Sequence, residues 1–175
     1  MFFVNILVYG LSTLLQTVVS SNCDSDFKNP EAQELLKDRA MKILLEPSQI
    51  TPYVKIDSEK GIVVLKGQSS LERAILFYHP LIKRIYEAFA NSDKKIRVDL
   101  SFRYFNTSSS KCFLDFFRML KKLENGGCKL DITWHYEKND AEMKETGEDY
   151  ADLVEMEFQY NEIIGLKGHF LRKAV

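Results

Sequence analysis

The residues best suited to chemistry in this chain form a run of small polar side chains, Asn106-Thr107-Ser108-Ser109-Ser110, directly after Tyr104 and Phe105. Hydroxyl groups at the first turn of a helix can cap the free backbone N–H groups there, or they can be phosphorylated. A phosphorylated Thr or Ser carries roughly −1.5 to −2 charges at neutral pH, which a helix N-terminus tolerates well. The run is therefore a candidate phosphorylation site, with a plain helix cap as the alternative.

Two elements must position this run. Residues 95–105 alternate apolar and polar side chains, which predicts a half-buried strand. After the run, apolar residues recur at helical spacing up to Asn125-Gly126-Gly127, which predicts a helix and its end; the stripe is Phe113, Phe116, Phe117, Leu120 and Leu123. The junction places Thr107 or a neighbouring Ser at the N-cap. Arg103 and Lys111 flank the run, either as cations that steady a phosphate or as solvated surface charges.

Further short motifs accompany the hydroxyl run in a fixed order along the chain. They are Thr51-Pro52 before a hairpin with Gly61, Gly67-Gln68-Ser69 before a helix with Phe77-Tyr78-His79-Pro80, then Tyr104 to Ser109, Gly126-Gly127 and Trp134-His135-Tyr136. With these motifs, the segment from about Leu45 to Glu162 resembles the SiaC family of bacterial regulatory phosphoproteins. One departure is visible: the family's Ser-x-Pro-Glu-Asn reads Ser69-Ser70-Leu71-Glu72-Arg73 here, which puts the identity of the partner in doubt.

The resemblance implies a non-catalytic signalling adaptor without a cofactor or metal. Thr107 corresponds to the family's phosphorylated threonine, and Tyr104, Asn106, Ser108, Ser109 and Glu72 would support it or contact partners. The implied partners are a protein kinase, a PP2C-type phosphatase and an effector such as a diguanylate cyclase, which the unphosphorylated protein binds and activates. The logic is similar to that of STAS-class anti-sigma-factor antagonists.

The remaining pattern predicts an α/β fold. Residues 53–67 predict a hairpin, Ser69 or Ser70 can cap a helix that continues past Pro80, residues 129–136 form a strand, and residues 153–160 form a last edge strand. Together these elements predict a single mixed, STAS-like β-sheet of four to five strands, with the helices packed mainly on one face.

Composition limits the classes of function. The chain has 175 residues, 45% of them hydrophobic, which is enough for one compact domain. With 24 basic against 25 acidic residues it lacks the basic excess of a nucleic-acid binder. Three cysteines at irregular spacing predict neither a disulfide framework nor a zinc site, so we expect reduced thiols and a cytoplasmic protein. The position of Cys112 near the helix start allows either a lowered thiol pKa or simple packing.

The predicted regulatory domain spans residues 45–162, with a tail over residues 163–175. Residues 1–44 form an N-terminal extension for which several interpretations stay open. Residues 1–22 are uncharged but lack the positive n-region of a signal peptide, so membrane association is not expected. Pro30 to Leu45 has the pattern of a helix, yet translation from Met41 would match the family's usual beginning and make the extension a misassigned or poorly ordered segment.

Two alternative functions remain. The first is a small hydrolase that uses a serine from Ser108 to Ser110 with His79 or His135 as its base. The absence of a Gly-x-Ser-x-Gly elbow, a phosphate-binding glycine loop and metal-ligand spacing argues against it. The second is a membrane-tethered binding module, which depends on residues 1–22 being inserted.

Overall fold

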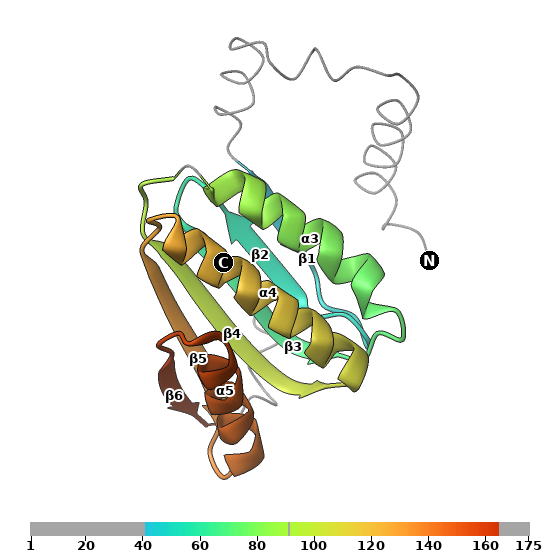
Figure 1. Ribbon diagram of the computed structural model, residues 1–175. Helices are drawn as coiled ribbons and strands as arrows, with labels where there is room; N and C mark the ends of the chain where they lie inside the picture. The colour runs from blue at the N-terminus through green and yellow to red at the C-terminus, as the bar shows by residue number, and fades with distance from the viewer. Residues whose placement is uncertain (1–40, 91, 165–175) are drawn as a thin grey trace, which may run out of the picture. The chain divides into compact units, whose positions relative to one another are not determined.

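The computed structural model describes residues 41–90 and 92–164, which form a six-stranded mixed sheet with helices (Figure 1). The strands are β1 (Lys42–Leu45), β2 (Tyr53–Asp57), β3 (Ile62–Ser69), β4 (Ile96–Phe105), β5 (Leu130–Glu137) and β6 (Gln159–Ile163). The helices are α3 (Ala74–Phe89), α4 (Thr107–Asn125) and α5 (Ala141–Val154).

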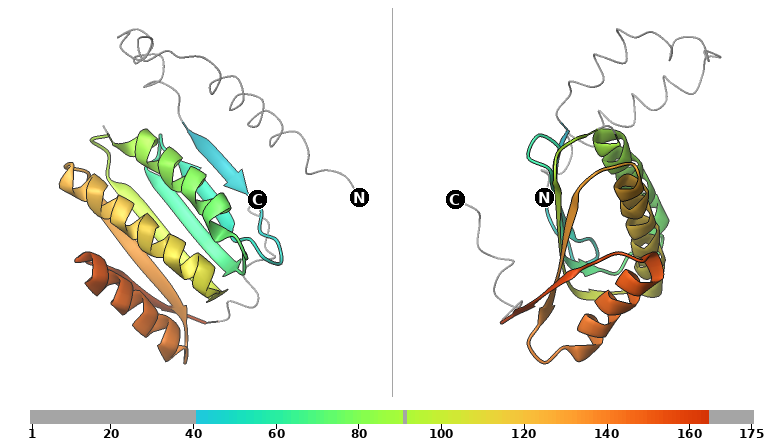
Figure 2. Two further views of the ribbon diagram at one scale, coloured as in Figure 1. Left: turned by 45° about the vertical axis from the view of Figure 1, so that its right-hand side comes forward. Right: turned by 60° about the vertical axis from the view of Figure 1, so that its left-hand side comes forward.

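The strands follow one another across the sheet in chain order, from β1 to β6. The first three are antiparallel and joined directly, whereas β3 to β6 are parallel and each step between them passes through a helix. Right-handed crossovers of this kind place successive helices on one face, and Figure 2 shows α3, α4 and α5 on the same side of the sheet. The predicted α/β fold with helices on one face is confirmed, with six strands in place of four to five.

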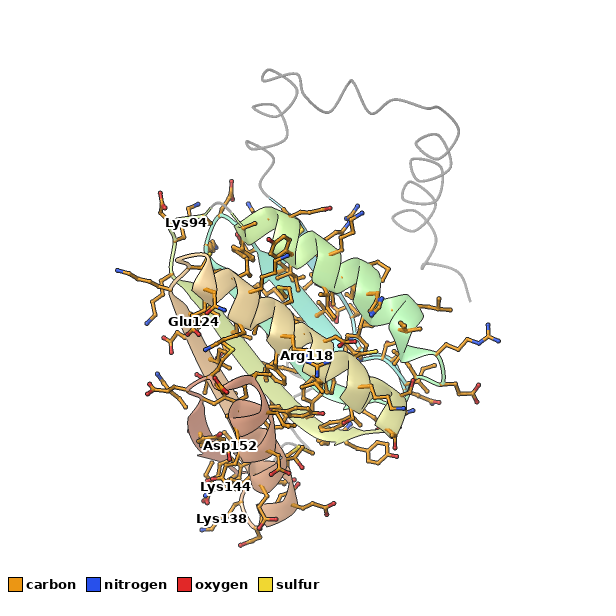
Figure 3. All side chains as sticks on the ribbon, in the orientation of Figure 1. Lys94, Arg118, Glu124, Lys138, Lys144 and Asp152 are labelled. Carbon is orange, nitrogen blue, oxygen red and sulfur yellow. The ribbon has the colours of Figure 1, made fainter. Side chains whose placement is uncertain are left out.

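The core lies between the sheet and these helices. The apolar face of β4, including Val98 and Phe102, is buried, and so is the predicted stripe of α4, including Phe113 and Phe117. Trp134 of β5 is 1% exposed and packs between this stripe and α5. The outward faces of α4 and α5 carry charged side chains, among them Arg118, Glu124 and Lys144 (Figure 3).

Two predicted elements differ from the structure. Residues 42–45 pair with β2, so the predicted helix over Pro30 to Leu45 does not include them. An edge strand gains a ladder of backbone hydrogen bonds there, and four residues are too few for apolar spacing to separate strand from helix. The predicted strand over 153–160 is also wrong up to residue 158, because α5 continues to Val154, Glu155 ends it in the left-handed conformation, and β6 begins only at Gln159.

The start of α3 also differs from expectation. Ser69 ends β3 and residues 70–73 form a loop, so α3 begins at Ala74 without a side-chain cap. The helix continues through Pro80, as predicted.

The helix-free face of the sheet is polar. Asp99 on β4 lies 3.2 Å from the Arg97 guanidinium and 3.4 Å from Nε2 of His135, and the other ring nitrogen of His135 lies 3.0 Å from Nδ2 of Asn161. Within residues 41–90 and 92–164, no helix has both the length and the apolar character needed to cross a membrane. The predictions for residues 1–22, for the helix from Pro30 to residue 40 and for the tail from residue 165 fall outside the described residues.

Candidate phosphorylation site at the start of α4

The hydroxyl run lies at the carboxyl end of β4, where α4 begins at Thr107. The neighbouring strand β3 ends beside it, because Ser69 pairs with Phe105 and the N–H of Asn106 donates to the carbonyl of Ser69 at 3.0 Å. The loop of residues 70–73 leaves the same edge of the sheet. Carboxyl ends of parallel strands are where open α/β sheets usually carry their functional residues.

Asn106, not Thr107, caps α4. Its backbone is extended, and its Oδ1 accepts a hydrogen bond from the N–H of Ser109 at 2.9 Å. The predicted capping role of Thr107 or a neighbouring Ser is therefore wrong. Asn is among the residues most favoured as an N-cap, so the sequence contained the signal for this assignment.

The three serines of the run are all engaged in hydrogen bonds. Ser108 Oγ donates to the carbonyl of Glu72 at 3.1 Å and accepts from the N–H of Ala74 at 3.3 Å. Ser109 is 0% exposed and its Oγ lies 2.8 Å from that of Ser69. Ser110 Oγ lies 2.7 Å from the hydroxyl of Tyr150 on α5. Each of these three hydroxyl groups therefore joins the start of α4 to another element or loop of the fold.

Thr107 differs from these serines. It is exposed, and among the hydrogen bonds of the described residues none involves its hydroxyl. As the first residue of α4 it presents this hydroxyl to solvent at the positive end of the helix. Of the four hydroxyl residues, Thr107 is the one that a modifying enzyme can reach without disrupting packing.

A second layer of hydroxyl groups lies beneath the run. Ser69 Oγ is within 2.7 Å of the hydroxyl of Tyr78 on α3, and Ser109 Oγ also donates to the carbonyl of Ser69 at 3.1 Å. Burial raises the pKa of Tyr78 well above its ordinary value, partly opposed by the hydrogen bond between its hydroxyl and that of Ser69. This buried network joins β3, α3 and α4. Sequence reasoning missed it, because Ser69 and Ser109 are 40 positions apart.

The other residues singled out in the sequence surround Thr107. Asn106 Nδ2 donates to the carbonyl of Leu71 at 3.0 Å, which holds the loop before Glu72 against the start of α4. Tyr104 near the end of β4 is exposed (53%). The apolar side chains of Ile75 (51%) and Leu76 (68%) at the start of α3 are exposed as well. The structure thus brings Tyr104, Asn106, Ser108, Ser109 and Glu72 together at one end of the sheet.

The two histidines of the hydrolase alternative lie elsewhere. His79 is 3.7 Å from Asp115 on the outward side of α3 and α4, and His135 is in the polar network on the helix-free face. No hydrogen bond among the described residues joins either histidine to Ser108, Ser109 or Ser110. Within residues 41–90 and 92–164, the serines of the run and these two histidines are therefore not paired as a nucleophile and its base.

Cys112 occupies a packing position. It is 4% exposed, and burial raises the pKa of its thiol, with the nearby Asp115 adding to the effect. The alternative of a thiol activated by the helix N-terminus is therefore wrong. Burial also raises the pKa of Cys128, whose thiol donates to the carbonyl of Phe89 at 3.3 Å.

Comparison with known proteins decides the family. A model of the SiaC family of regulatory phosphoproteins matches residues 45–163. The chain belongs to the SiaC family. A curated relative, an uncharacterized protein of Pseudomonas aeruginosa strain UCBPP-PA14, is 26% identical over 105 residues, which cover 60% of this chain and 83% of the relative.

Solved structures of SiaC from Pseudomonas aeruginosa share the fold. The apo form superposes with a TM-score of 0.63 at 23% identity, covering 69% of this chain and 98% of that one. SiaC in complex with the diguanylate cyclase SiaD, of which it is the activator, gives a TM-score of 0.65 at 23% identity, covering 69% and 99%. A further SiaC structure gives 0.60 at 25% identity, covering 71% and 98%.

Proposed function

We propose that this SiaC-family chain is a non-catalytic adaptor that is switched by phosphorylation of Thr107. The observation that carries the proposal is the difference within the hydroxyl run: Ser108, Ser109 and Ser110 hold the fold together, whereas Thr107 is exposed and its hydroxyl is unengaged within the described residues. Membership of a family of regulatory phosphoproteins supports the same assignment.

The physical effect of the phosphate would be local. It adds roughly −1.5 to −2 charges to the first residue of α4, where the helix dipole favours an anion, so the fold is retained. The exposed surface changes instead, because Tyr104, Ile75 and Leu76 offer uncovered apolar area at the same end of the sheet. A partner that docks there on the unphosphorylated protein would meet a bulky, strongly hydrated anion after modification.

The proposed partners are a protein kinase that modifies Thr107, a PP2C-type phosphatase that restores it, and an effector such as a diguanylate cyclase. The effector is supported by the solved complex in which SiaC is the activator of a diguanylate cyclase. We further propose that the adaptor works in the cytoplasm, that residues 45–162 form its regulatory domain, and that it binds no nucleic acid. The near balance of 24 basic and 25 acidic residues supports the last point.

The experiment is intact-mass and peptide mass spectrometry on the protein purified from its own cells, grown in several conditions, with phosphatase inhibitors present. We expect one phosphate on Thr107 in the wild type and in Ser110→Ala, and none in Thr107→Ala. Ser110→Ala is a matched control because it removes a hydroxyl from the same run. A phosphate that persists in Thr107→Ala, or its absence in every condition, would refute the proposal.

A further inference from the structure

The loop of residues 70–73, which joins β3 to α3, is fastened to the start of α4 by side chains of the hydroxyl run. Asn106 Nδ2 bonds the carbonyl of Leu71, and Ser108 Oγ bonds both the carbonyl of Glu72 and the N–H of Ala74. Arg73 therefore lies between Glu72 and Ala74, whose backbone groups both bond to the Oγ of Ser108. Thr107 is the residue next to Ser108.

The side chain of Arg73 is exposed at this position, and no ion pair or hydrogen bond of its guanidinium is found among the described residues. Arg73 is also the N-cap residue of α3, where its side chain makes no capping hydrogen bond. A cation at the N-terminus of a helix opposes the helix dipole, so this residue does not stabilise α3 electrostatically. Its charge therefore faces solvent in the unphosphorylated protein.

We propose that Arg73 binds the phosphate carried by Thr107, so that the 70–73 loop and the start of α4 form an intramolecular phosphate-binding site. This inference rests on the proposed function. The backbone on either side of Arg73 is hydrogen-bonded to Ser108, the residue that follows Thr107. The arginine side chain is long, and its guanidinium can donate two parallel hydrogen bonds to a phosphate. Lys111, one helical turn after Thr107 and exposed, can add a second positive charge.

The neighbouring carboxylate of Glu72 disfavours a phosphate on Thr107, whereas Arg73 favours it. Glu72 is exposed on the same loop and repels a phosphate on Thr107, so Arg73 supplies the attraction that offsets this repulsion. Binding would draw the guanidinium across the surface between Thr107 and the exposed Ile75 and Leu76 at the start of α3. The phosphate would then change the shape of the partner surface as well as its charge.

The test uses the full-length chain with phosphothreonine incorporated during translation at position 107, which needs no kinase. The pKa of the phosphate is measured by ³¹P NMR titration in the otherwise wild-type protein, in Arg73→Asn and in Arg84→Asn. Arg84 is a matched control because it is an exposed arginine farther along α3. A bound cation favours the dianion, so we expect Arg73→Asn to raise the phosphate pKa by roughly half a unit and Arg84→Asn to leave it unchanged.

A second readout separates a phosphate contact from a general effect of charge. Arg73→Lys keeps the charge but loses the planar pair of donors, so we expect its phosphate pKa to lie between those of wild type and Arg73→Asn. The unphosphorylated Arg73→Asn should unfold at a temperature no lower than that of wild type, since the guanidinium has no partner among the described residues and Asn is favoured at the N-cap position that Arg73 occupies. Equal phosphate pKa values in wild type and Arg73→Asn would overturn the inference.

The two proposals fail separately. Because the phosphate is installed during translation, the titration gives the same answer whether or not cells phosphorylate Thr107. An absence of phosphate on Thr107 in cells would refute the proposed switch and leave the titration result standing. A phosphate found on Thr107 in cells, together with equal pKa values, would keep the switch and remove the role of Arg73.

Discussion

Asn106 provides the sharpest test of how the site is built, because its side chain makes two separable hydrogen bonds. Oδ1 caps α4 by accepting from the N–H of Ser109 at 2.9 Å, and Nδ2 donates to the carbonyl of Leu71 at 3.0 Å. Asn106→Ala removes both. Loss of an N-cap costs about 0.5 to 2 kcal/mol, and loss of a second hydrogen bond costs about 0.5 to 1.5 kcal/mol. We therefore expect a total loss of about 1 to 3.5 kcal/mol in the free energy of unfolding.

Asn106→Asp separates the two contributions. A carboxylate keeps the capping acceptor and interacts favourably with the helix dipole, by about 0.3 to 1 kcal/mol. It cannot donate to the carbonyl of Leu71, so the hydrogen bond to the 70–73 loop is lost and a carboxylate oxygen faces the Leu71 carbonyl oxygen. We expect a net loss of roughly 0 to 1 kcal/mol, which ranks the proteins as wild type, then Asn106→Asp, then Asn106→Ala.

The assay is urea unfolding at neutral pH, followed by the fluorescence of Trp134 and by far-ultraviolet circular dichroism. Trp134 is the one tryptophan of the chain and is 1% exposed, so its emission reports on the core. Coincident transitions by the two probes would justify a two-state analysis. An Asn106→Ala protein within about 0.5 kcal/mol of wild type, the range of ordinary surface substitutions, would refute the capping assignment.

Three further predictions concern the core and the site. Gly147→Ala would place a Cβ 2.7 Å from the ring of the buried Trp134, so we expect a loss of about 1 to 3 kcal/mol in urea unfolding, whereas Glu145→Ala on the exposed side should change little. Thr107→Ala should unfold within about 0.5 kcal/mol of wild type, because its hydroxyl is unengaged within the described residues; a larger loss would show a structural role. For Tyr78 the folded pKa lies above the unfolded one, so stability is retained below about pH 10, the unfolded value, and falls as pH rises beyond it. Tyr78→Phe should lose about 1 kcal/mol at pH 7 but show a shallower decline of unfolding free energy between pH 10 and 11; equal slopes would contradict the assigned burial effect.

Several parts of the fold and site could be predicted from the sequence because their signals are local. The strict alternation of residues 96–102 and the helical spacing from Phe113 to Leu123 each fix which face is buried, and both predictions are confirmed. The motifs around Thr107 that resemble the SiaC family are likewise runs of neighbouring residues. The position of the hydroxyl run between a strand and a helix followed from the change of period from two to 3.6 residues.

Predictions failed where local patterns were short or ambiguous. Residues 42–45 satisfy both strand and helix spacing, and pairing with β2 decided for the strand. Val154, Met156 and Phe158 are all buried, as in a strand with one buried face. Val154, however, is the last residue of α5, and Met156 and Phe158 lie in the segment after it, so the alternation of buried side chains does not come from a strand. Hydroxyl residues favour helix caps, which predicts Ser69 or Ser70 as the cap of the next helix, but β3 continues to Ser69 and α3 begins only at Ala74.

The sequence by itself determined the family, the α/β class and the presence of a hydroxyl run where a helix begins, because periodicity and motifs are written in neighbouring residues. Only the tertiary structure decided which hydroxyl is exposed. Ser108, Ser109 and Ser110 find their partners at Glu72, Ser69 and Tyr150, each at least 36 positions away, and four hydroxyl residues that look equivalent in the chain thereby become distinct. Long-range hydrogen bonds of this kind depend on how β3, α3 and α5 pack against α4, which no local pattern specifies.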